Sequence, residues 1–258
     1  MRYFIVIIIT TTLAFAAFGQ IDKVEGRCMT CHKEISPGLY LQWYTSSHGG
    51  HNVTCLDCHQ ADRKDVDAFE HYDAYIATLV TPKDCGECHP EQTEQNQNSH
   101  HATAGLILQT KHAYQAHTVG GSPAVRAGCE SCHGSKIIID KDSPNKLAEG
   151  IWPNSGIGRI NPDGSLGSCN ACHSRHAFSP AVARRPGNCG KCHLGPDHPQ
   201  KEIYDESKHG IAFRAYEYEL NLNSDRWIVG VDYYQAPTCA TCHMSATQQQ
   251  DLNHDVGR

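Results

Sequence analysis

The sequence lacks several features by which soluble enzymes are usually recognised. It has only three methionines and three tryptophans, and all fourteen cysteines belong to one recurring pattern. No thiol is therefore left for nucleophilic catalysis or for structural disulfides. The net charge of −6 argues against nucleic acid as a partner. After residue 19, no segment is apolar over the roughly 20 residues that a membrane-spanning helix needs.

The recurring pattern is Cys-x-x-Cys-His, and it occurs seven times. Two thiols at this spacing reach the two vinyl groups of a porphyrin, and the imidazole of the next residue then lies under the iron. Zinc knuckles and disulfide frameworks also use paired cysteines, but neither requires a histidine directly after every second cysteine. The pattern therefore predicts seven covalently attached c-type haems, at Cys28, Cys31, His32; Cys55, Cys58, His59; Cys85, Cys88, His89; Cys129, Cys132, His133; Cys169, Cys172, His173; Cys189, Cys192, His193; and Cys239, Cys242, His243.

Histidines outside the motifs are candidates for the second axial position of each iron. An iron with two histidines is saturated and passes electrons, whereas an iron with an open side binds a small molecule. One open haem would leave six that need a second histidine, and the supply exceeds that number. The count alone therefore leaves both alternatives standing. The eleven candidates are His48, His51, His71, His100, His101, His112, His117, His176, His198, His209 and His254.

The motif spacing also bears on the fold. Motif starts are separated by 27, 30, 44, 40, 20 and 50 residues, which argues against a solenoid of identical units. Residues 62–79 and 91–117 have helix-forming composition without interior proline, and we predict helices there. Residues 144–167 are rich in proline and glycine and predict a long ordered loop. We expect a mainly α fold with extensive loops, few strands and a haem-packed core that does not form without haem.

The first nineteen residues predict export. Arg2 precedes an apolar run, and small residues lie before Gln20 in the pattern of a cleavage site. The run is shorter than a membrane anchor requires. We therefore predict a signal peptide over 1–19 that is cleaved near Gly19, and a mature chain, 20–258, in the periplasm or otherwise outside the cytoplasm.

Several segments together resemble one family, the hydroxylamine oxidoreductase family of octahaem cytochromes c. The resemblance covers nearly the whole mature chain, and the order of its motifs is very specific. The segments are residues 128–134, 152–168, 169–176, 189–200 and 206–210, with residues 43–48 after the first motif and 99–102 after the third.

This resemblance implies roles for particular residues. The fourth motif matches the catalytic haem of the family, whose iron is open on its distal side, and Asp197 and His198 match the pair over that iron. A carboxylate and an imidazole there could exchange protons with a nitrogenous ligand. The resemblance implies distal ligands at His48, His71, His100 or His101, His176, His209 and His254. Because His176 lies only three residues past His173, we expect it to serve a neighbouring haem.

The sequence departs from the family in two places. It ends where family members continue to an eighth haem motif and a helical region that holds their trimers together, so the chain looks like an N-terminal portion, with three haems in 20–125 and the catalytic haem in 126–258. Oxidising members carry a tyrosine three residues beyond the seventh motif's histidine, whereas this chain has Ala246. That difference favours a reductive member.

The sequence thus supports a redox enzyme acting on hydroxylamine, nitrite or nitric oxide at an open haem beside His133. Its partners would be a small nitrogen compound and a cytochrome or quinone-linked redox protein, in a homotrimer if the protein is full length. One alternative is a pure electron conduit with every iron ligated by two histidines. Another is a truncated haem protein without turnover.

Overall fold

The structure is a computed structural model, and it describes residues 23–109, 111–151 and 156–256. The predicted signal peptide therefore lies outside the described residues. The described chain is mainly helical, with short helices joined by long loops and one two-stranded sheet, as the sequence predicts. The elements are α2 (Lys23–Ile35), α3 (Pro37–Tyr44), α4 (Ser47–Gly50), α5 (Cys55–His59), β1 (Phe69–His71), β2 (Ala74–Ile76), α6 (Pro82–Gly86), α7 (Pro90–Asn98), α8 (His100–Thr103), η1 (Ala104–Gln109), α9 (Lys111–Ala124), η2 (Val125–Cys129), α10 (Glu130–His133), η3 (Cys169–Ala171), α11 (Pro180–Arg184), α12 (Pro186–Cys189), α13 (Gln200–Glu206), α14 (Lys208–Tyr216), η4 (Glu217–Glu219) and α15 (Cys239–His243).

Helix caps explain why such short segments around the motifs are helical. Thr54 precedes α5 and forms a capping box with Asp57, and Thr81 does the same with Asp84 before α6. Thr238 and Thr241 form a third box before α15. A capping box satisfies two of the backbone N–H groups that every helix leaves free at its start. One turn of helix therefore forms where the cysteines and the histidine of a motif must share a face.

The prediction of a helix over 62–79 is wrong. Residues 69–76 form an antiparallel hairpin in which Phe69 pairs with Ile76, and Tyr72 takes a left-handed conformation in the turn with φ of 55°. The Asp62 side chain accepts a hydrogen bond from the backbone of Lys64, and that of Asp65 accepts one from the backbone of Asp62. Such local bonds compete with a helix, and aromatic residues in alternation favour a strand.

The other two segment predictions are close to what is found. Residues 91–117 are helical but broken at Ser99 into α7, α8, η1 and the start of α9. The described parts of 144–167 contain no helix and are tied down by isolated bridges, such as that between Lys136 and Ile160. Residues 152–155 of this loop lie outside the described residues.

The apolar core is small for a chain of this length. One cluster centres on Trp227, Tyr233 and Leu220, and a second on Leu79, Ile137 and Leu147. Trp227 and Tyr233 stack at 4.4 Å between ring centroids, and the Arg184 guanidinium lies 5.0 Å from the Trp227 ring. The clusters are small and separate, which agrees with an interior that haems would fill.

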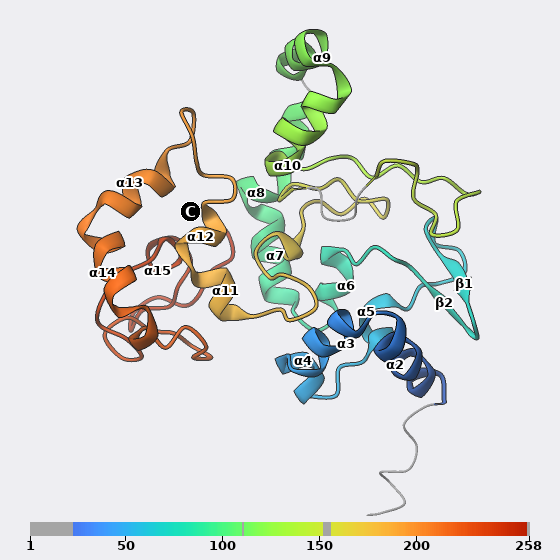
Figure 1. Cartoon of the computed structure of the whole chain (residues 1–258), viewed down its shortest axis with the longest axis horizontal. Coiled ribbons are helices and arrows are strands. Elements are labelled where there is room, and N and C mark those ends of the chain that lie inside the picture. Colours follow the sequence, from blue (N-terminus) through green and yellow to red (C-terminus); the bar gives the residue numbers. More distant parts are fainter. Residues whose placement is uncertain (1–22, 110, 152–155, 257–258) are drawn as a thin grey trace, which may run out of the picture.

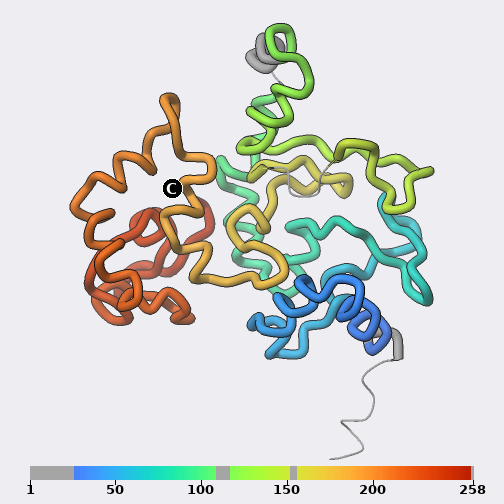
Figure 2. Tube along the Cα trace, in the orientation of Figure 1, coloured from blue at the N-terminus to red at the C-terminus, as the bar shows by residue number. Residues whose placement is uncertain are grey.

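The first and last parts of the chain lie on opposite sides of the molecule (Figure 1), with α2 to α5 on one side and α11 to α15 on the other. Residues around α7 and the 156–180 segment run between them, as the tube in Figure 2 shows. The end of the described chain returns to this middle layer, where the backbone N–H of His254 donates to the Gln95 side chain at 2.7 Å. Helix α9 projects from the body (Figure 1). Within the described ranges, no helix combines the length and apolar character needed to cross a membrane.

Arg159 ties the middle layer together and gives a stability prediction. Its side chain is 1% exposed and donates to Asn161 at 2.6 Å and to the Val80 carbonyl at 2.7 Å. Burial lowers the pKa of Arg159 to about 10, so it stays charged at neutral pH. Arg159→Met leaves both acceptors buried without this donor, and we expect a loss of about 3 kcal/mol in the free energy of unfolding.

Denaturant unfolding of the holoprotein measures this loss. The matched control is Arg185→Met, which removes an exposed ion pair with Glu217 and should cost less than about 1 kcal/mol. Equal losses for the two variants would contradict the role given to Arg159.

Candidate functional site

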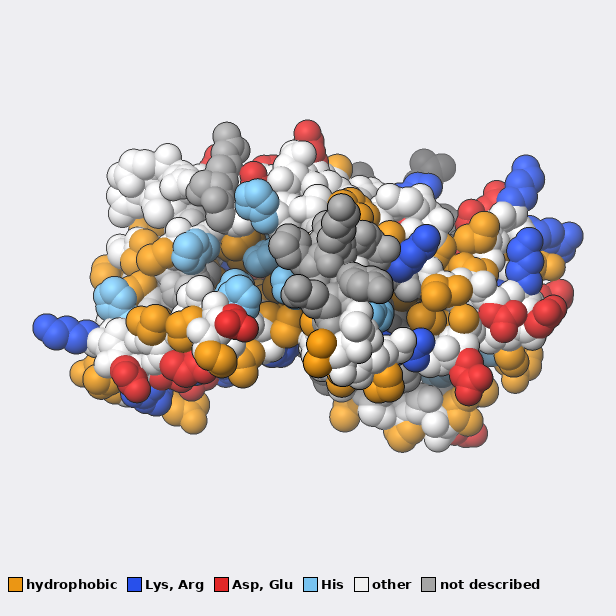
Figure 3. All heavy atoms as spheres, turned by 90° about the horizontal axis from the view of Figure 1, so that it is seen from above, with side chains coloured by type: hydrophobic (Ala, Val, Ile, Leu, Met, Phe, Trp, Pro, Cys, Tyr) orange, Lys and Arg blue, Asp and Glu red, His pale blue; other side chains and the backbone are white. Residues whose placement is uncertain are grey.

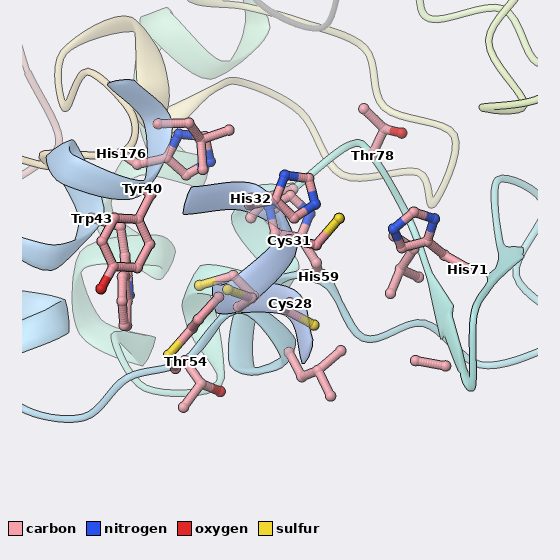
Figure 4. Close-up of a pocket in the computed structure, with 18 of the residues that line it drawn as sticks. Cys28, Cys31, His32, Tyr40, Trp43, Thr54, His59, His71, Thr78 and His176 are labelled. Carbon is pink, nitrogen blue, oxygen red and sulfur yellow. The ribbon is translucent and has the colours of Figure 1, made fainter. Parts of the chain in front are cut away.

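The first two motifs share one large cavity. It has a volume of about 1160 Å³ and is lined by both motifs together with aromatic side chains from α3 and the 69–78 segment. Figure 4 shows His32, His59, His71 and His176 directed into the same space as the sulfur atoms of the first motif. The volume exceeds the usual 300–1,000 Å³ of a small-ligand pocket. A mostly apolar cavity of this size with paired thiols and imidazoles fits porphyrins.

Histidine rings face one another in pairs across the places where haems are predicted. In each pair one ring belongs to a motif and the other does not. The ring centroids are 6.3 Å apart for His32 and His71, 6.3 Å for His59 and His176, 6.1 Å for His89 and His48, 6.4 Å for His173 and His254, and 6.2 Å for His193 and His101.

This separation has a simple meaning. A metal–imidazole bond is about 2.0 Å long, and the ring centre lies about 1 Å beyond the nitrogen, so two imidazoles that share one metal have centroids about 6 Å apart. Ordinary aromatic pairs also fall within about 4.5–7 Å, so the evidence is the repeated pairing of one motif histidine with one histidine outside the motifs rather than the distance alone. Five motif histidines thus have a counterpart at the spacing of bis-histidine ligation. His176 lies opposite His59 of the second motif, as expected for a residue that serves a neighbouring haem.

Burial lowers the pKa of several of these imidazoles and so favours the neutral form, which is the form that ligates a metal. Burial, followed by His254, lowers the pKa of His173 to about 4. Burial, followed by His59, lowers the pKa of His176 to about 4. The Nδ1 of His59 lies 2.8 Å from the Ala77 carbonyl, a contact that assigns the proton to Nδ1 and leaves Nε2 free for a metal.

Three of the non-motif histidines are presented by one recurring local structure, which we call the serine–histidine turn. It covers residues 46–49, 99–102 and 207–210. In each, a serine comes first and caps the helix that follows. Its hydroxyl accepts a hydrogen bond from the backbone N–H three residues later and donates one to the carbonyl three residues earlier. The histidine stands two residues after the serine. The three histidines placed in this way are His48, His101 and His209.

The small residue that follows each histidine is required by packing. A Cβ on Gly49 would lie 2.4 Å from the Trp43 carbonyl oxygen, and one on Gly210 would lie 2.1 Å from that of Tyr204. Ala102, in the same place, is completely buried. The repeated geometry assigns His101 rather than His100 to the ligand position, and His101 is the ring that faces His193.

His209 occupies the third serine–histidine turn but faces no imidazole among the described side chains. Helix α13, which precedes it, lies against the seventh motif. The Tyr204 hydroxyl donates to the Pro237 carbonyl at 2.9 Å, and Cys239 is among the charges that raise the pKa of Tyr204, after burial. The helix before His209 is thus tied to the residues that precede the seventh motif.

The fourth motif is positioned by tight backbone contacts. The N–H groups of Ile157 and Gly158 donate to the carbonyls of Cys132 and His133, which end α10. A Cβ at Gly158 would lie 2.3 Å from the Gly105 nitrogen, so only glycine permits this approach. Among the described side chains, no imidazole faces His133. His112, a candidate from the sequence, has a side chain outside the described ones.

Asp197 and His198 lie in the loop between α12 and α13. Both are exposed, and Gly195 turns the chain there with φ of 79°. The ring of His198 is 6.3 Å from that of His193, close to the 6.2 Å between His101 and His193, so two histidines outside the motifs lie beside the sixth motif's histidine. This loop follows the sixth motif, whose Cys192 contacts Cys132 of the fourth motif. The predicted pair is therefore at the junction of the fourth and sixth motifs.

Sulfur contacts reveal which motifs are neighbours in space. The sulfur atoms of Cys85 and Cys169 lie close to one another, as do those of Cys189 and Cys239. The Cys132–Cys192 contact adds a third pair. The third motif thus adjoins the fifth, and the sixth adjoins both the fourth and the seventh. Haems held at these positions would be close neighbours, which is what electron relay requires.

The remaining candidates have no such arrangement. His100 and His117 are exposed, and the Nδ1 of His51 lies 2.7 Å from the Ser47 carbonyl. Several histidine side chains are open on the face drawn in Figure 3. Sequence reasoning missed the serine–histidine turn, although its Ser-x-His-Gly/Ala spelling is visible in the chain. It also missed Arg175, which lines the cavity.

Comparison with known proteins agrees with this geometry. The model of the family described as seven times multi-haem cytochrome CxxCH matches residues 51–258. A probable nitrite reductase-hydroxylamine oxidoreductase fusion protein of Kuenenia stuttgartiensis is 27% identical over 84% of this chain. A nine-heme cytochrome c of Desulfovibrio desulfuricans (strain ATCC 27774 / DSM 6949 / MB) is 26% identical over 87% of the chain and is covered over 73% of its own length.

Solved structures are similar as well. A hypothetical multiheme protein matches with a TM-score of 0.80 and 30% identity, covering 92% of this chain and 57% of its own. The Kuenenia stuttgartiensis reducing HAO-like protein complex shares the fold, with a TM-score of 0.63 at 24% identity, over 89% of this chain and 43% of that one. The chain spans only 25% of the length of the fusion protein. It belongs to the seven times multi-haem cytochrome CxxCH family and is a multihaem c-type cytochrome with covalently bound haem c.

Proposed function

We propose that this cytochrome carries seven haems, of which six relay electrons and the one attached at Cys129 and Cys132 converts a small nitrogen compound. The observation that carries the proposal is the distribution of imidazoles. Five motif histidines face a second histidine, and the helix before His209 is bonded to Pro237, two residues before the seventh motif. His133 and His243 are the two motif histidines that face no second imidazole among the described side chains, and the family resemblance points to the haem at His133 as the open one.

Bound haem supplies one-electron redox chemistry, and an iron with an open side also binds a small ligand. The chain's own contribution at this place is different. His133 would hold the cofactor, and the exposed pair Asp197 and His198 would supply groups that give and take protons. Hydroxylamine and nitrite are the compounds named for the fusion protein to which this chain is similar. Ala246, by the family resemblance, favours the reductive direction.

Export, partners and assembly complete the proposal. The N-terminal run supports a location in the periplasm or otherwise outside the cytoplasm, and the redox partner would be a cytochrome or a quinone-linked protein. A trimer would apply to a full-length protein with the eighth haem. The similarity to a nine-heme cytochrome c supports the alternative of a pure electron conduit.

Electron paramagnetic resonance of the ferric holoprotein separates the two functions. We expect one high-spin haem that binds nitric oxide or cyanide, together with low-spin bis-histidine signals, because an iron with one strong axial ligand stays high-spin. His209→Ala should add a second high-spin signal. His100→Ala is the control, because His100 is also a histidine outside the motifs but is exposed and faces no motif histidine, and it should add none. Entirely low-spin wild-type protein that binds no ligand would overturn the enzyme proposal in favour of the conduit.

A further inference from the structure

Arg175 is a half-buried cation in the cavity of the first two motifs, and its guanidinium has no hydrogen-bond or ion-pair partner among the described residues. Burying an unpaired guanidinium is costly, because its five donors lose water without gaining acceptors. Native structures therefore supply an anion or several carbonyls to such a group.

The other arginines in similar places are satisfied by the protein. Arg27 lines the same cavity and pairs with Asp73. Arg184 donates to two backbone carbonyls and lies over the Trp227 ring. The carboxylates that line the cavity are Glu34 and Asp73, and neither pairs with Arg175. The Arg175 guanidinium is therefore available to an anionic group of a molecule that fills the cavity.

Haem c brings suitable anions, since each porphyrin carries two propionate groups. A guanidinium binds a carboxylate through two parallel N–H···O bonds, which lysine does not reproduce. Arg175 directly precedes His176 in the chain, and its charge reaches the ligand pair. After burial and His59, Arg175 is the next cause that lowers the pKa of His176, and it also lowers that of His59.

We propose that Arg175 binds a propionate of the haem held between His59 and His176, and that this contact raises the reduction potential of that haem. An unneutralised propionate beside the iron stabilises the ferric state, which carries one more positive charge than the ferrous state. Pairing the propionate with a guanidinium removes this bias. Arg175 is then a residue that tunes one step of the relay. The inference rests on the proposed His59–His176 ligation.

Redox titration of the holoprotein, followed by haem absorbance and paramagnetic resonance, tests the inference. In Arg175→Gln we expect one low-spin haem to shift to a more negative potential by about tenfold in its equilibrium constant, which is 59 mV for one electron. Arg175→Lys keeps the positive charge but loses the two parallel N–H donors of the guanidinium, and it should shift the reduction potential of the same haem by less. Arg27→Gln is the matched control, because it lines the same cavity but is already paired, and should leave that potential in place.

Haem content and the number of low-spin signals are measured in parallel, so a failure of the His59–His176 ligation is distinguished from a failure of the inference. If Arg175→Gln does not retain its haems, the redox titration of Arg175→Lys tests the inference instead. Fully loaded variants in which every potential equals the wild-type value would overturn the proposal. A shift as large in Arg27→Gln as in Arg175→Gln would overturn it as well.

Discussion

Cys169→Ser combined with Cys172→Ser is expected to abolish accumulation of folded holoprotein, whereas the same double change in the first motif should leave a protein with six haems. The fifth motif lies where four parts of the chain meet. Cys169 contacts Cys85 of the third motif, and the Asn188 side chain, next to the sixth motif, donates to the Cys172 carbonyl at 3.2 Å. His173 faces His254, which is tied to α7.

Loss of the fifth haem removes the group that fills this meeting point, and the small apolar clusters do not replace it. Trp227 and Leu79 belong to separate clusters on either side. A cytochrome whose stability is only about 5–15 kcal/mol has little margin against an empty cavity of porphyrin size. We expect the yield of soluble haem protein to fall about tenfold or more, because unfolded chains are degraded.

The measurement is haem-stained gel and mass spectrometry of exported protein from matched cultures. Cys28→Ser with Cys31→Ser is the control, since α2 lies at the edge of the molecule (Figure 1). Comparable yields of the two double variants, each one haem mass lighter than wild type, would contradict a central role for the fifth motif.

The cofactor chemistry was predictable from sequence because it depends on covalent spacing within five residues. Cys28, Cys31 and His32 lie on one helix whatever the rest of the chain does. The pairing of histidines was not predictable in the same way, because it joins distant residues. His59 faces His176, and His89 faces His48, which precedes it in the chain. The sequence identifies ligand types, and only the tertiary fold assigns them to particular motifs.

The segment predictions failed where local polar bonds outweigh composition. Residues 62–79 contain good helix formers, yet Asp62 and Asp65 bond to nearby backbone groups and Tyr72 turns the chain into a hairpin. That hairpin places the His71 ring opposite the His32 ring. The serine–histidine turn shows the opposite case. Its Ser-x-His pattern is present in the sequence at Ser46 and Ser207. Its structural role depends on the hydrogen bonds of the serine hydroxyl, which only the structure shows.

The second large effect concerns the proposed catalytic loop. Asp197→Ala and His198→Asn are each expected to lower turnover by about 10²–10⁴-fold, the usual contribution of a positioned general acid or base. Both side chains are exposed, and that of Asp197 makes no hydrogen bond within the described part of the chain, so neither change should disturb haem attachment. The loss should therefore appear in turnover with the haem count unchanged.

Steady-state assays with hydroxylamine as donor and, separately, with nitrite as acceptor measure the effect and the direction of reaction together. Glu202→Gln is the matched control, because Glu202 accepts from the Gly195 N–H of the same loop at 2.8 Å and glutamine keeps that acceptor. Wild-type turnover in Asp197→Ala and His198→Asn would remove the pair from the reaction. If a fully loaded wild-type protein turned over neither compound, the seven motifs would serve electron relay alone, and the sixth motif, with neighbours on two sides, would be the branch point of that relay.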